Sequence, residues 1–445
     1  MNIKGFSGHL VRRGDPGFEQ ACGIWNRAVR RTPRLVARCH TAADVAAAVR
    51  HAAAEGLPLA VRAGGHNFAG HALVDDGLVM DLRGLRAIRV DGDVLEAGAG
   101  LLWGEVDAVT LPHGLAAAGG SVSKVGVAGF TLGTGLGWLG RRHGLAADNL
   151  LSARVVTADG ELLDVRPDAH PDLLWALRGG CGNFGVVTSF TFRLHPMRAE
   201  PLAGTLMFPV ERAAEVIRRV VDLPMADECN YAAVLTSPPF AAKPVLLVTA
   251  LHLGPPAEAR AAMDELRRAT GEPLLDTIKP TPFAAFQRST DESAPEGTRW
   301  DVRSEWLRPL DDAAIESAVA AARAASSPLS EVLFRPLGGA IATGPDTPFS
   351  YRHASFLVEV IANWAEGDGT RERQWMRETW HSLLRLSAGG ADVNHLGLGE
   401  GPDRVRSAYS SQVHDRLAAI KQVYDPANLF RSTQNIPPSR QPEHP

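Results

Sequence analysis

A loop at residues 61–70 combines three glycines with one histidine, and this combination can do chemistry. It reads Val61-Arg-Ala-Gly-Gly-His-Asn-Phe-Ala-Gly70 and follows a segment expected to be a strand. Glycine permits positive φ angles and a close approach of the backbone, so neighbouring amide groups can form a concave site for a pyrophosphate. Tight turning alone would also explain the glycines. Neither explanation accounts for His66, for which a surface or hydrogen-bonded polar residue is the ordinary alternative.

A second glycine-rich stretch, residues 126–144, contains Gly135-Leu-Gly137-Trp-Leu-Gly140. This is a literal G-x-G-x-x-G, and Asp159 and Glu161 lie about where a nicotinamide-dinucleotide site would place its ribose-binding acid. That fingerprint belongs at the turn of a compact βαβ unit, whereas this glycine run is extended. Asp159-Gly160 is also a dipeptide typical of a hairpin turn. We therefore interpret the match as coincidental.

One acidic residue, Glu359, lies in the otherwise apolar segment Phe356-Leu-Val-Glu-Val-Ile361. A lone carboxylate is costly to bury without a partner or a task, so Glu359 is a candidate pocket residue. If the segment is a strand and its pairing is shifted by two residues, Glu359 stays on the same face of the sheet. Tyr351, His353 and Arg335 are weaker candidates, for which packing or an ion pair is the ordinary explanation.

Composition and charge exclude several classes of protein. An apolar content of 45% and a charged content of 22% argue against a disordered, fibrous or membrane protein. A net charge of -4 and a pI near 6.4 argue against nucleic acid or an anionic membrane as the main partner. We see no export signal and no membrane-spanning apolar run, so a cytoplasmic protein is expected. Neither a metal site nor a disulfide framework is expected from the four separated cysteines, which we predict to be buried thiols: Cys22, Cys39, Cys181 and Cys229.

The first 200 residues predict an α+β pattern in which short strands surround glycine-rich turns. Residues 41–56 begin with a capping threonine and end on glycine, which predicts a helix. Two β-rich runs joined at Asp159-Gly160 predict a hairpin over residues 151–165. The remaining elements expected here are strands at 57–62, 79–82 and 94–97 and a helix at 103–110.

The composition changes after Pro196, and a length of 445 residues predicts two or three domains. Between residues 201 and 388 glycines become rare and helix-like runs alternate with strand-like runs, which predicts a domain with one large sheet. The helices are expected at 211–221, 258–269 and 312–325, and the strands at 203–209, 245–252, 330–335 and 354–361. After Asp403 the chain is expected to be helical again, through 416–423, before a proline-rich tail.

Five segments in this order resemble the berberine bridge enzyme-like family of FAD-linked oxidases, within the p-cresol methylhydroxylase (PCMH) and vanillyl-alcohol oxidase (VAO) superfamily. The segments are Trp25-Asn26 with Pro33, Arg62-Ala-Gly-Gly-His66, residues 126–149 ending in Gly144-Leu-Ala-Ala-Asp-Asn149, Arg178-Gly-Gly-Cys-Gly-Asn-Phe-Gly-Val-Val187, and Tyr424-Asp-Pro-Ala-Asn-Leu-Phe430 with Gln434-Asn-Ile-Pro-Pro438. The similarity covers nearly the whole chain. It implies an α+β fold with a PCMH/VAO-type FAD-binding domain (1–200). A substrate-binding domain (201–395), built on a large antiparallel sheet with flanking helices, would follow, and a segment (396–445) would return to the FAD domain.

The same resemblance implies that His66 is bonded to the 8α-methyl carbon of FAD. Many relatives add a second bond from a cysteine, but the matching position here is Val122, so a single link is expected. Val125 matches a position near the oxygen-reactive edge of the flavin, where a small residue is associated with oxidases. The residues assigned to the cofactor are His66 and Val125 with Arg62, Gly64, Gly65, Asn67, Phe68, Gly70, His71, Gly126, Gly129, Thr131, Gly133, Gly135, Asp148, Asn149, Gly185, Val187, Asn394 and Asn435.

The catalytic side departs from the family pattern. Many relatives carry a tyrosine base in a Tyr-x-Asn element, whereas this sequence has Asp392-Val-Asn394. An aspartate, with an ordinary pKa near 3.9, cannot act as the same tyrosinate. Burial could raise its pKa enough for Asp392 to serve as a general base, and a simple turn residue is the alternative. Plant relatives carry a glutamate base in about the strand of Glu359.

The expected function is therefore that of an FAD-dependent oxidase. It would take a hydride from a small organic substrate such as an alcohol, phenol, sugar or amine of specialised metabolism, and molecular oxygen would reoxidise the flavin to give hydrogen peroxide. The small-molecule substrate and oxygen are the only partners expected. The alternatives on the same scaffold are an oxidative cyclase, a dehydrogenase or a flavin-oxygenating enzyme. A flavin-binding protein without turnover is the alternative from a different class.

Overall fold

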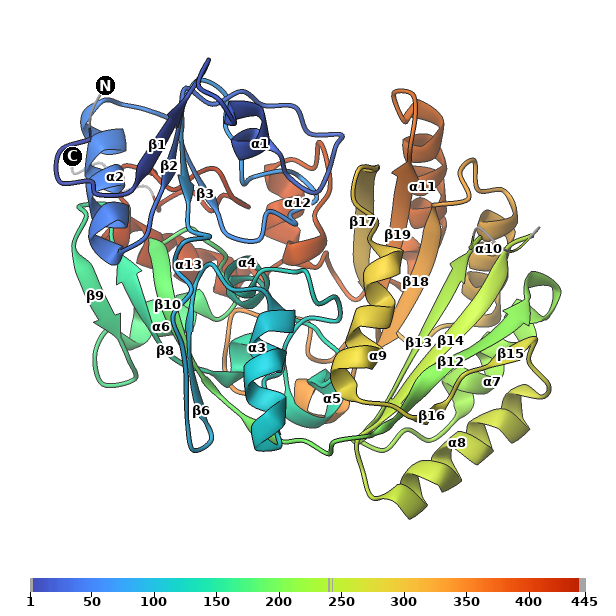
Figure 1. The fold of residues 1–445 in the computed structure, drawn as a ribbon. Helices are drawn as coiled ribbons and strands as arrows, with labels where there is room; N and C mark the ends of the chain where they lie inside the picture. The colour runs from blue at the N-terminus through green and yellow to red at the C-terminus, as the bar shows by residue number, and fades with distance from the viewer. Residues whose placement is uncertain (1–2, 239–240, 242, 440–445) are drawn as a thin grey trace.

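The computed structural model describes residues 3–238, 241 and 243–439. Figure 1 shows two bodies side by side, with the N-terminal part of the chain and its last segment on the left and the middle of the chain on the right. Each body has its own large hydrophobic core. The left body is called the first region below, and the right body the second region.

The first region contains two sheets. One has the strand order β1-β2-β4-β3, with β2 and β3 both parallel to β4, and the other is antiparallel with the order β5-β6-β10-β8-β9. The strands are β1 (His9–Arg12), β2 (Leu35–Arg38), β3 (Leu59–Arg62), β4 (Leu78–Asp81), β5 (Ile88–Asp91), β6 (Val94–Gly98), β8 (Leu150–Val156), β9 (Leu162–Val165) and β10 (Val186–Arg193), and the short strands β7 (Leu115–Ala116) and β11 (His195–Pro196) form a separate pair. The helices are α1 (Phe18–Cys22), α2 (Ala42–Ala54), α3 (Trp103–Thr110), α4 (Val127–Leu132), α5 (Gly140–His143) and α6 (Pro171–Leu177).

The second region is built on an antiparallel eight-stranded sheet, ordered β15-β12-β14-β13-β18-β19-β17, with β16 also paired to β12. Its strands are β12 (Leu202–Pro209), β13 (Cys229–Thr236), β14 (Val245–His252), β15 (Leu275–Asp276), β16 (Lys279–Pro280), β17 (Arg299–Leu307), β18 (Glu331–Pro336) and β19 (Phe356–Trp364). Its helices are α7 (Ala213–Asp222), α8 (Pro256–Thr270), α9 (Phe283–Ser289), α10 (Asp312–Arg323) and α11 (Thr370–Leu383).

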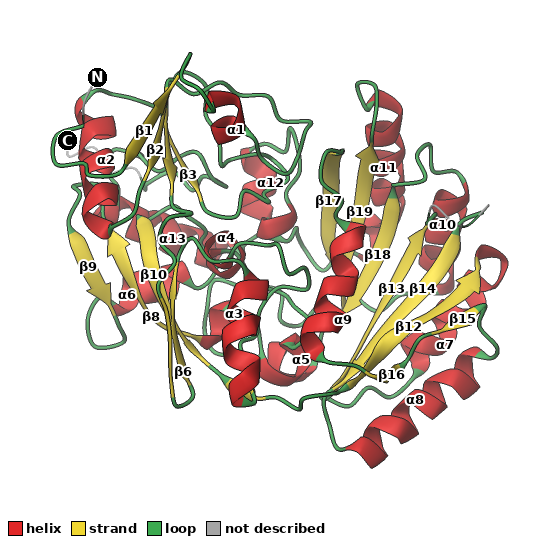
Figure 2. Cartoon of the chain, in the orientation of Figure 1, coloured by secondary structure: helices red, strands yellow, loops and turns green. Residues whose placement is uncertain are grey.

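The two faces of this sheet have different surroundings. Because side chains alternate along a strand, Val358 and Val360 of β19 lie on one face and Glu359 and Ile361 on the other. The valines pack in the second core, together with residues of α10 and α11 such as Ile315. Figure 2 shows these helices on the side of the sheet away from the first region. The face that carries Glu359 is thus directed toward the first region.

The last segment returns to the first region. Residues of α12 (Pro402–Ser407) and α13 (Ser411–Tyr424) belong to the first core, as do Ala391 and Val393 just before them. Figure 1 shows both helices behind the first region, with the two marked termini on the same side. The chain therefore crosses from the second region to the first near residue 390, beside the end of β17.

The α+β prediction is confirmed, and most predicted elements are present. Thr41 caps α2 through a capping box with Asp44, and the hairpin β8–β9 turns at Gly160, where φ is +77°. The strands β13 and β17 were not predicted. The β17 sequence alternates aromatic or small residues with charged ones that are buried, namely Asp301, Arg303 and Glu305. A buried strand with that many charges does not match the apolar pattern by which strands are recognised.

Three of the four cysteines are buried, as predicted, whereas Cys22 is partly exposed, and all four are free thiols. Among the helices of the described residues, none has the length and apolar character needed to cross a bilayer.

Candidate active site

A large cavity lies between the two regions. Its lining comes from the loops after β3 and before α4 in the first region, from β17, β18 and β19 in the second, and from the last segment. Three parts of the chain that are distant in sequence therefore form one site. Such a position between two regions is typical of a cofactor or substrate site.

The wall from the first region is made of backbone. Gly64 and Gly126 face each other so closely that a Cβ atom on Gly64 would lie 2.5 Å from the Gly126 nitrogen. Gly65, with φ of +74°, turns the chain beside them. Gly129 in α4 has open space where a side chain would be. Only glycine fits at the first two positions, and the result is a smooth surface of amide groups that suits a phosphate-bearing ligand.

His66 extends this wall with a side chain. Its ring stacks on Trp25, with ring centroids 5.1 Å apart, and Trp25 in turn stacks on Trp300 of β17 at 4.4 Å. Burial lowers the pKa of His66 to about 4. The imidazole is therefore neutral near pH 7, and a ring nitrogen keeps the lone pair that a covalent bond would need.

Two further positions bear on a second covalent link. Val122 lines the cavity, as does Cys181. Burial raises the pKa of the Cys181 thiol to about 12, so this cysteine is protonated at neutral pH and lacks the reactive thiolate form.

Most residues that the resemblance assigned to FAD line the cavity. They are Gly64, Gly65, His66, Asn67, Phe68, His71, Val125, Gly126, Gly129, Gly185, Val187 and Asn394. The residues that do not line it are Arg62, Gly70, Thr131, Gly133, Gly135, Asp148, Asn149 and Asn435.

Asp148 and Asn149 were assigned to FAD by the resemblance, but neither lines the cavity. Asp148 forms an ion pair with Arg352, with 2.5 Å between Oδ1 and Nη2. The Asn149 amide donates to the carbonyls of His143 and Leu145, at 2.8 and 2.9 Å. Both side chains thus fix the end of the glycine-rich stretch.

Arg62 and Gly133 also act on the shape of the site. The Arg62 guanidinium donates to the carbonyls of Ala21 and Gly23, so it ties β3 to the segment that leads to Trp25. At Gly133 a Cβ atom would lie 1.9 Å from Oδ1 of Asn394. The absence of a side chain there makes room for Asn394, which does line the cavity.

The opposite wall carries a chain of charged side chains. The His395 ring lies between two carboxylates, with 2.7 Å from Nδ1 to Asp392 Oδ2 and 2.9 Å from Nε2 to Glu359 Oε1. The other oxygen of Glu359 accepts from Nε of Arg335 at 2.7 Å, and Arg335 also donates to Ser121 at 3.1 Å. Glu359, His395 and Arg335 line the cavity, and Asp392 lies behind His395.

These contacts set the charges of the chain. Burial disfavours a charged imidazole, but the carboxylates of Glu359 and Asp392 outweigh it and raise the pKa of His395 to about 10. Burial likewise disfavours the charged carboxylate of Glu359, yet Arg335 and His395 lower its pKa to about 2. At neutral pH the wall therefore holds an imidazolium between two carboxylates, and Glu359 is fully ionised.

Asp392 does not have the position expected of a residue that contacts substrate. It is 1% exposed, and its Oδ1 accepts two hydrogen bonds, from the Thr134 hydroxyl at 2.9 Å and from the backbone nitrogen of Asn394 at 3.1 Å. Its other oxygen is bonded to His395. Asp392 therefore contacts the cavity lining through His395, and its role as a general base stays a prediction.

His395 itself was missed in the sequence. A histidine three residues after an aspartate, Asp392-Val-Asn-His395, was a signal that could have been used, since a turn brings such residues together. The contact with Glu359 was not visible because it joins residues that are distant in sequence. Of the weaker candidates, Arg335 belongs to the site, whereas Tyr351 and His353 do not line the cavity.

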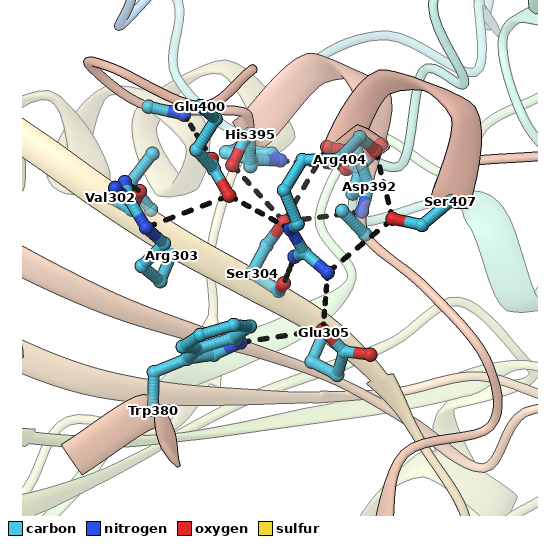
Figure 3. Close-up of polar contacts among 12 residues, drawn as sticks. Val302, Arg303, Ser304, Glu305, Trp380, Asp392, His395, Glu400, Arg404 and Ser407 are labelled. Carbon is cyan, nitrogen blue, oxygen red and sulfur yellow. Dashed lines mark hydrogen bonds and ion pairs between the residues drawn. The ribbon is translucent and has the colours of Figure 1, made fainter. Parts of the chain in front are cut away.

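The turn that carries Asp392 and His395 is held against β17 by a second polar network. Figure 3 shows Arg404 between the carboxylates of Glu305 and Glu400, at 3.1 and 2.9 Å. Its Nη2 also donates to the Ser304 carbonyl at 2.8 Å, and the Ser304 hydroxyl donates to the His395 carbonyl at 3.1 Å. The position of His395 is thus fixed by β17, the edge strand of the large sheet.

The residues of the first wall fit a flavin dinucleotide. The glycine surface would be filled by added Cβ atoms at Gly64 and Gly126, and a neutral histidine lies at its end. The buried side-chain nitrogen of Gln434 lines the cavity without a hydrogen-bond partner among the described residues. A buried donor of this kind needs a partner, and a bound cofactor would supply one.

Comparison with known proteins gives the class and the family. The model of the FAD binding domain matches residues 33–166, and the berberine and berberine-like model matches residues 389–437. Together with the fold and the glycine wall, these matches define an FAD-linked oxidoreductase, and FAD is its cofactor.

The chain is 33% identical to (R)-6-hydroxynicotine oxidase of Paenarthrobacter nicotinovorans, over 97% of each protein. It is 32% identical to an uncharacterised FAD-linked oxidoreductase of Bacillus subtilis (strain 168), over 98% of each. The crystal structure of 6-hydroxy-D-nicotine oxidase from Arthrobacter nicotinovorans superposes with a TM-score of 0.89 at 30% identity, over 98% of each chain. The chain therefore belongs to the berberine bridge enzyme-like family of FAD-linked oxidoreductases, within the PCMH/VAO superfamily.

Proposed function

We propose that the protein is an oxidase that holds FAD through one covalent bond, from His66 to the 8α-methyl carbon. The observation that carries this proposal is a neutral histidine at the end of the glycine wall, opposite the charged chain of Glu359 and His395. Val122 cannot form a thioether, and the buried Cys181 thiol is protonated, so neither adds a second bond. We assign flavin binding to residues 1–200 and 396–445, and substrate binding to residues 201–395.

When bound, FAD accepts a hydride from the substrate and returns the electrons to an acceptor. Glu359, in its ionised form, accepts a hydrogen bond from the O–H or N–H group of the substrate and so stabilises the positive charge that develops there as the hydride leaves. The imidazolium of His395 and the guanidinium of Arg335 keep Glu359 ionised and aimed into the cavity. Asp392 holds the His395 ring in place from behind.

We assign oxygen as the electron acceptor and hydrogen peroxide as the product. A small side chain at Val125, which lines the cavity, supports this assignment. A small organic substrate is supported by the relatives, since one is named for the oxidation of a hydroxynicotine. A dehydrogenase would consume no oxygen, and an oxygenating enzyme would form no equal amount of peroxide, whereas an oxidative cyclase would be recognised by its cyclised product.

The covalent bond is tested by acid precipitation. The wild-type pellet should stay yellow, because the flavin is attached to the polypeptide, and the His66→Ala pellet should be colourless, with flavin in the supernatant. His71→Ala is a matched control, since His71 also lines the cavity and burial lowers its pKa to about 4. A colourless wild-type pellet would contradict the proposal.

Turnover is tested by anaerobic bleaching of the flavin with a panel of alcohols, sugars, phenols and cyclic amines. A substrate that bleaches the flavin should consume oxygen and form an equal amount of peroxide in air. If dithionite reduces the flavin but no member of a broad panel does, the chain is a flavin-binding protein without turnover.

A further inference from the structure

Trp25 and Asn26 belong to one of the five segments that carry the resemblance, and the proposed function gives them no role. They lie between α1 and β2 of the first region, and the Asn26 side chain is fully buried. The Asn26 amide nitrogen donates to the Trp300 carbonyl, and its Oδ1 accepts from the Trp300 backbone nitrogen, both at 2.9 Å. The same amide nitrogen donates to the carbonyl of Phe68, two residues after His66, at 2.7 Å. Asn26 therefore joins the loop of His66 to β17, the edge strand of the large sheet.

The His66 ring is oriented by packing alone. It forms no hydrogen bond or ion pair with any residue that the structure describes. Its face lies against Trp25, with an angle of 18° between the ring planes, and the other stacking partner of Trp25 is Trp300, at 27°. The rings of Trp300, Trp25 and His66 are called the three-ring stack below. A histidine in the first region is thus oriented through a side chain of the second region.

Trp25 is held in place mainly by the second region. Besides its stacking on Trp300, its Nε1 donates to the carbonyl of Ala294, just before β17, at 3.2 Å. Trp300 is 2% exposed and packs with Val302 and Ile361 of the large sheet. Trp25, which belongs to the first region in sequence, therefore takes its position from the sheet of the second.

A bond from His66 to the 8α-methyl carbon demands that a ring nitrogen point at that carbon. The bond forms as the imidazole and the methyl carbon each lose one proton, and the two protons and two electrons end on oxygen, which becomes one hydrogen peroxide. Reacting atoms must lie about 3 to 3.5 Å apart with their orbitals aligned, and a displacement of about 1 Å can slow a reaction about a hundredfold. A histidine ring without neighbours rotates among its rotamers. The three-ring stack restricts this rotation.

We propose that the three-ring stack positions His66 for its bond to FAD, so that attachment of the cofactor depends on a side chain of the second region. Trp25 and Trp300 are positioning residues for this step, whereas binding of the cofactor belongs to the glycine wall. The proposal rests on the proposed function, because only a covalent bond requires this orientation of His66.

The test is the rate at which bound flavin becomes attached in Trp300→Leu. This change removes the ring but keeps the two hydrogen bonds to Asn26, because they come from the Trp300 backbone. Protein is purified at intervals after induction and precipitated with acid, which leaves attached flavin in the pellet and unattached flavin in the supernatant. Total flavin per protein should equal that of wild type. The half-time of attachment should be at least about tenfold longer, because the ring of His66 is no longer aligned.

Two further variants separate orientation from packing. Trp300→Phe keeps an aromatic face for Trp25, so its half-time should stay within about threefold of wild type. Trp364→Leu is the matched control. Trp364 of β19 is 3% exposed and lies beside the level of Trp300, but its side chain packs in the second core and does not line the cavity. Its half-time should equal that of wild type. Trp25→Leu should be as slow as Trp300→Leu, and it gives the same test if Trp300→Leu is insoluble.

Three results would overturn the positioning role. They are an unchanged half-time in Trp300→Leu, an equal delay in Trp364→Leu, and a loss of total flavin in Trp300→Leu, which would assign the ring to binding and not to attachment. The wild-type pellet separates this proposal from the proposed function. If it is colourless at every interval, there is no covalent bond and both fail. If it is yellow and Trp300→Leu attaches flavin equally fast, only the positioning role fails.

Discussion

The two walls of the cavity are built in different ways. The wall of the first region is backbone, where Gly64 and Gly126 meet without room for a Cβ atom on either. The wall of the second region is side chains, where Asp392, His395 and Glu359 join over distances of 2.7 to 2.9 Å. A backbone wall can hold only what fits its shape. A wall of charged side chains can be changed one residue at a time while the fold stays the same, so we expect binding of FAD to depend on the first wall and the choice of substrate on the second.

The largest effect should follow from filling the backbone wall. In Gly126→Val, the added Cβ atom would lie 2.6 Å from the Gly64 nitrogen, and neither backbone can move aside without shifting a strand end. We expect purified Gly126→Val to contain almost no flavin, measured as the ratio of flavin to protein absorbance.

Gly401→Val is the matched control for this change. Gly401 precedes α12 as Gly126 precedes α4, both with ordinary negative φ angles, but a Cβ atom on Gly401 meets nothing within 4 Å. This variant should carry as much flavin as wild type. A full flavin content in Gly126→Val would mean that the close approach of the two loops is not needed for the cofactor.

The same contrast explains which parts of the site could be predicted from the sequence. A backbone wall requires glycine at fixed spacing, so it leaves a motif, and most residues predicted for FAD line the cavity. Asp148 and Asn149, which were predicted from the same motifs, lie outside the cavity lining. A motif reports that a loop has a certain shape, but it does not distinguish residues that touch the ligand from residues that hold the loop, as Arg352 holds Asp148.

The side-chain wall left almost no motif. Glu359 was found because a lone acid in an apolar strand is unusual, yet its partners Arg335 and His395 come from β18 and from the turn after the large sheet. Strand order and register decide these contacts, and they depend on pairing between distant segments. Strand β17, which fixes His395 through Ser304, was itself missed because its buried charges hide the pattern of a strand.

A smaller effect should follow from changing Asp392, which belongs to the second wall but lies behind His395 and does not line the cavity. In Asp392→Asn, the amide cannot keep the charged bond to His395 Nδ1, which is 2.7 Å long in the wild type. A hydrogen bond between charged groups contributes about 1.5 to 3 kcal/mol, so we expect flavin reduction by the best substrate to slow by about tenfold to a hundredfold. Flavin content should be unchanged, since Asp392 does not line the cavity. Stopped-flow absorbance measures the rate.

Thr134→Val serves as the control, because it removes a hydrogen bond to the other oxygen of Asp392 and leaves the His395 contact in place. Its rate of flavin reduction should stay within about threefold of the wild-type rate, because the variant loses only one neutral hydrogen-bond donor to Asp392. A near-normal rate in Asp392→Asn would remove Asp392 from the mechanism. Loss of flavin in that variant would show that the two walls are not independent.

The smallest effect is a fall in stability between pH 6 and pH 10, to which the second wall should contribute through His395. The pKa of His395 is raised from an ordinary value near 6.5 to about 10, so between these values the folded protein binds a proton that the unfolded chain has lost. The stabilisation by His395 is complete below pH 6.5 and is lost as the pH rises through 10. Urea unfolding at pH 6, 8 and 10 should therefore show that the free energy of unfolding declines as the pH rises. In His395→Gln this decline should be smaller than in wild type by about 1 kcal/mol or more.

His381→Gln is the control, because His381 lies at an exposed position of α11, and its decline should equal that of wild type. Equal slopes for wild type and His395→Gln would mean that His395 is not held as an imidazolium, and Arg335 alone would then keep Glu359 ionised in the cavity.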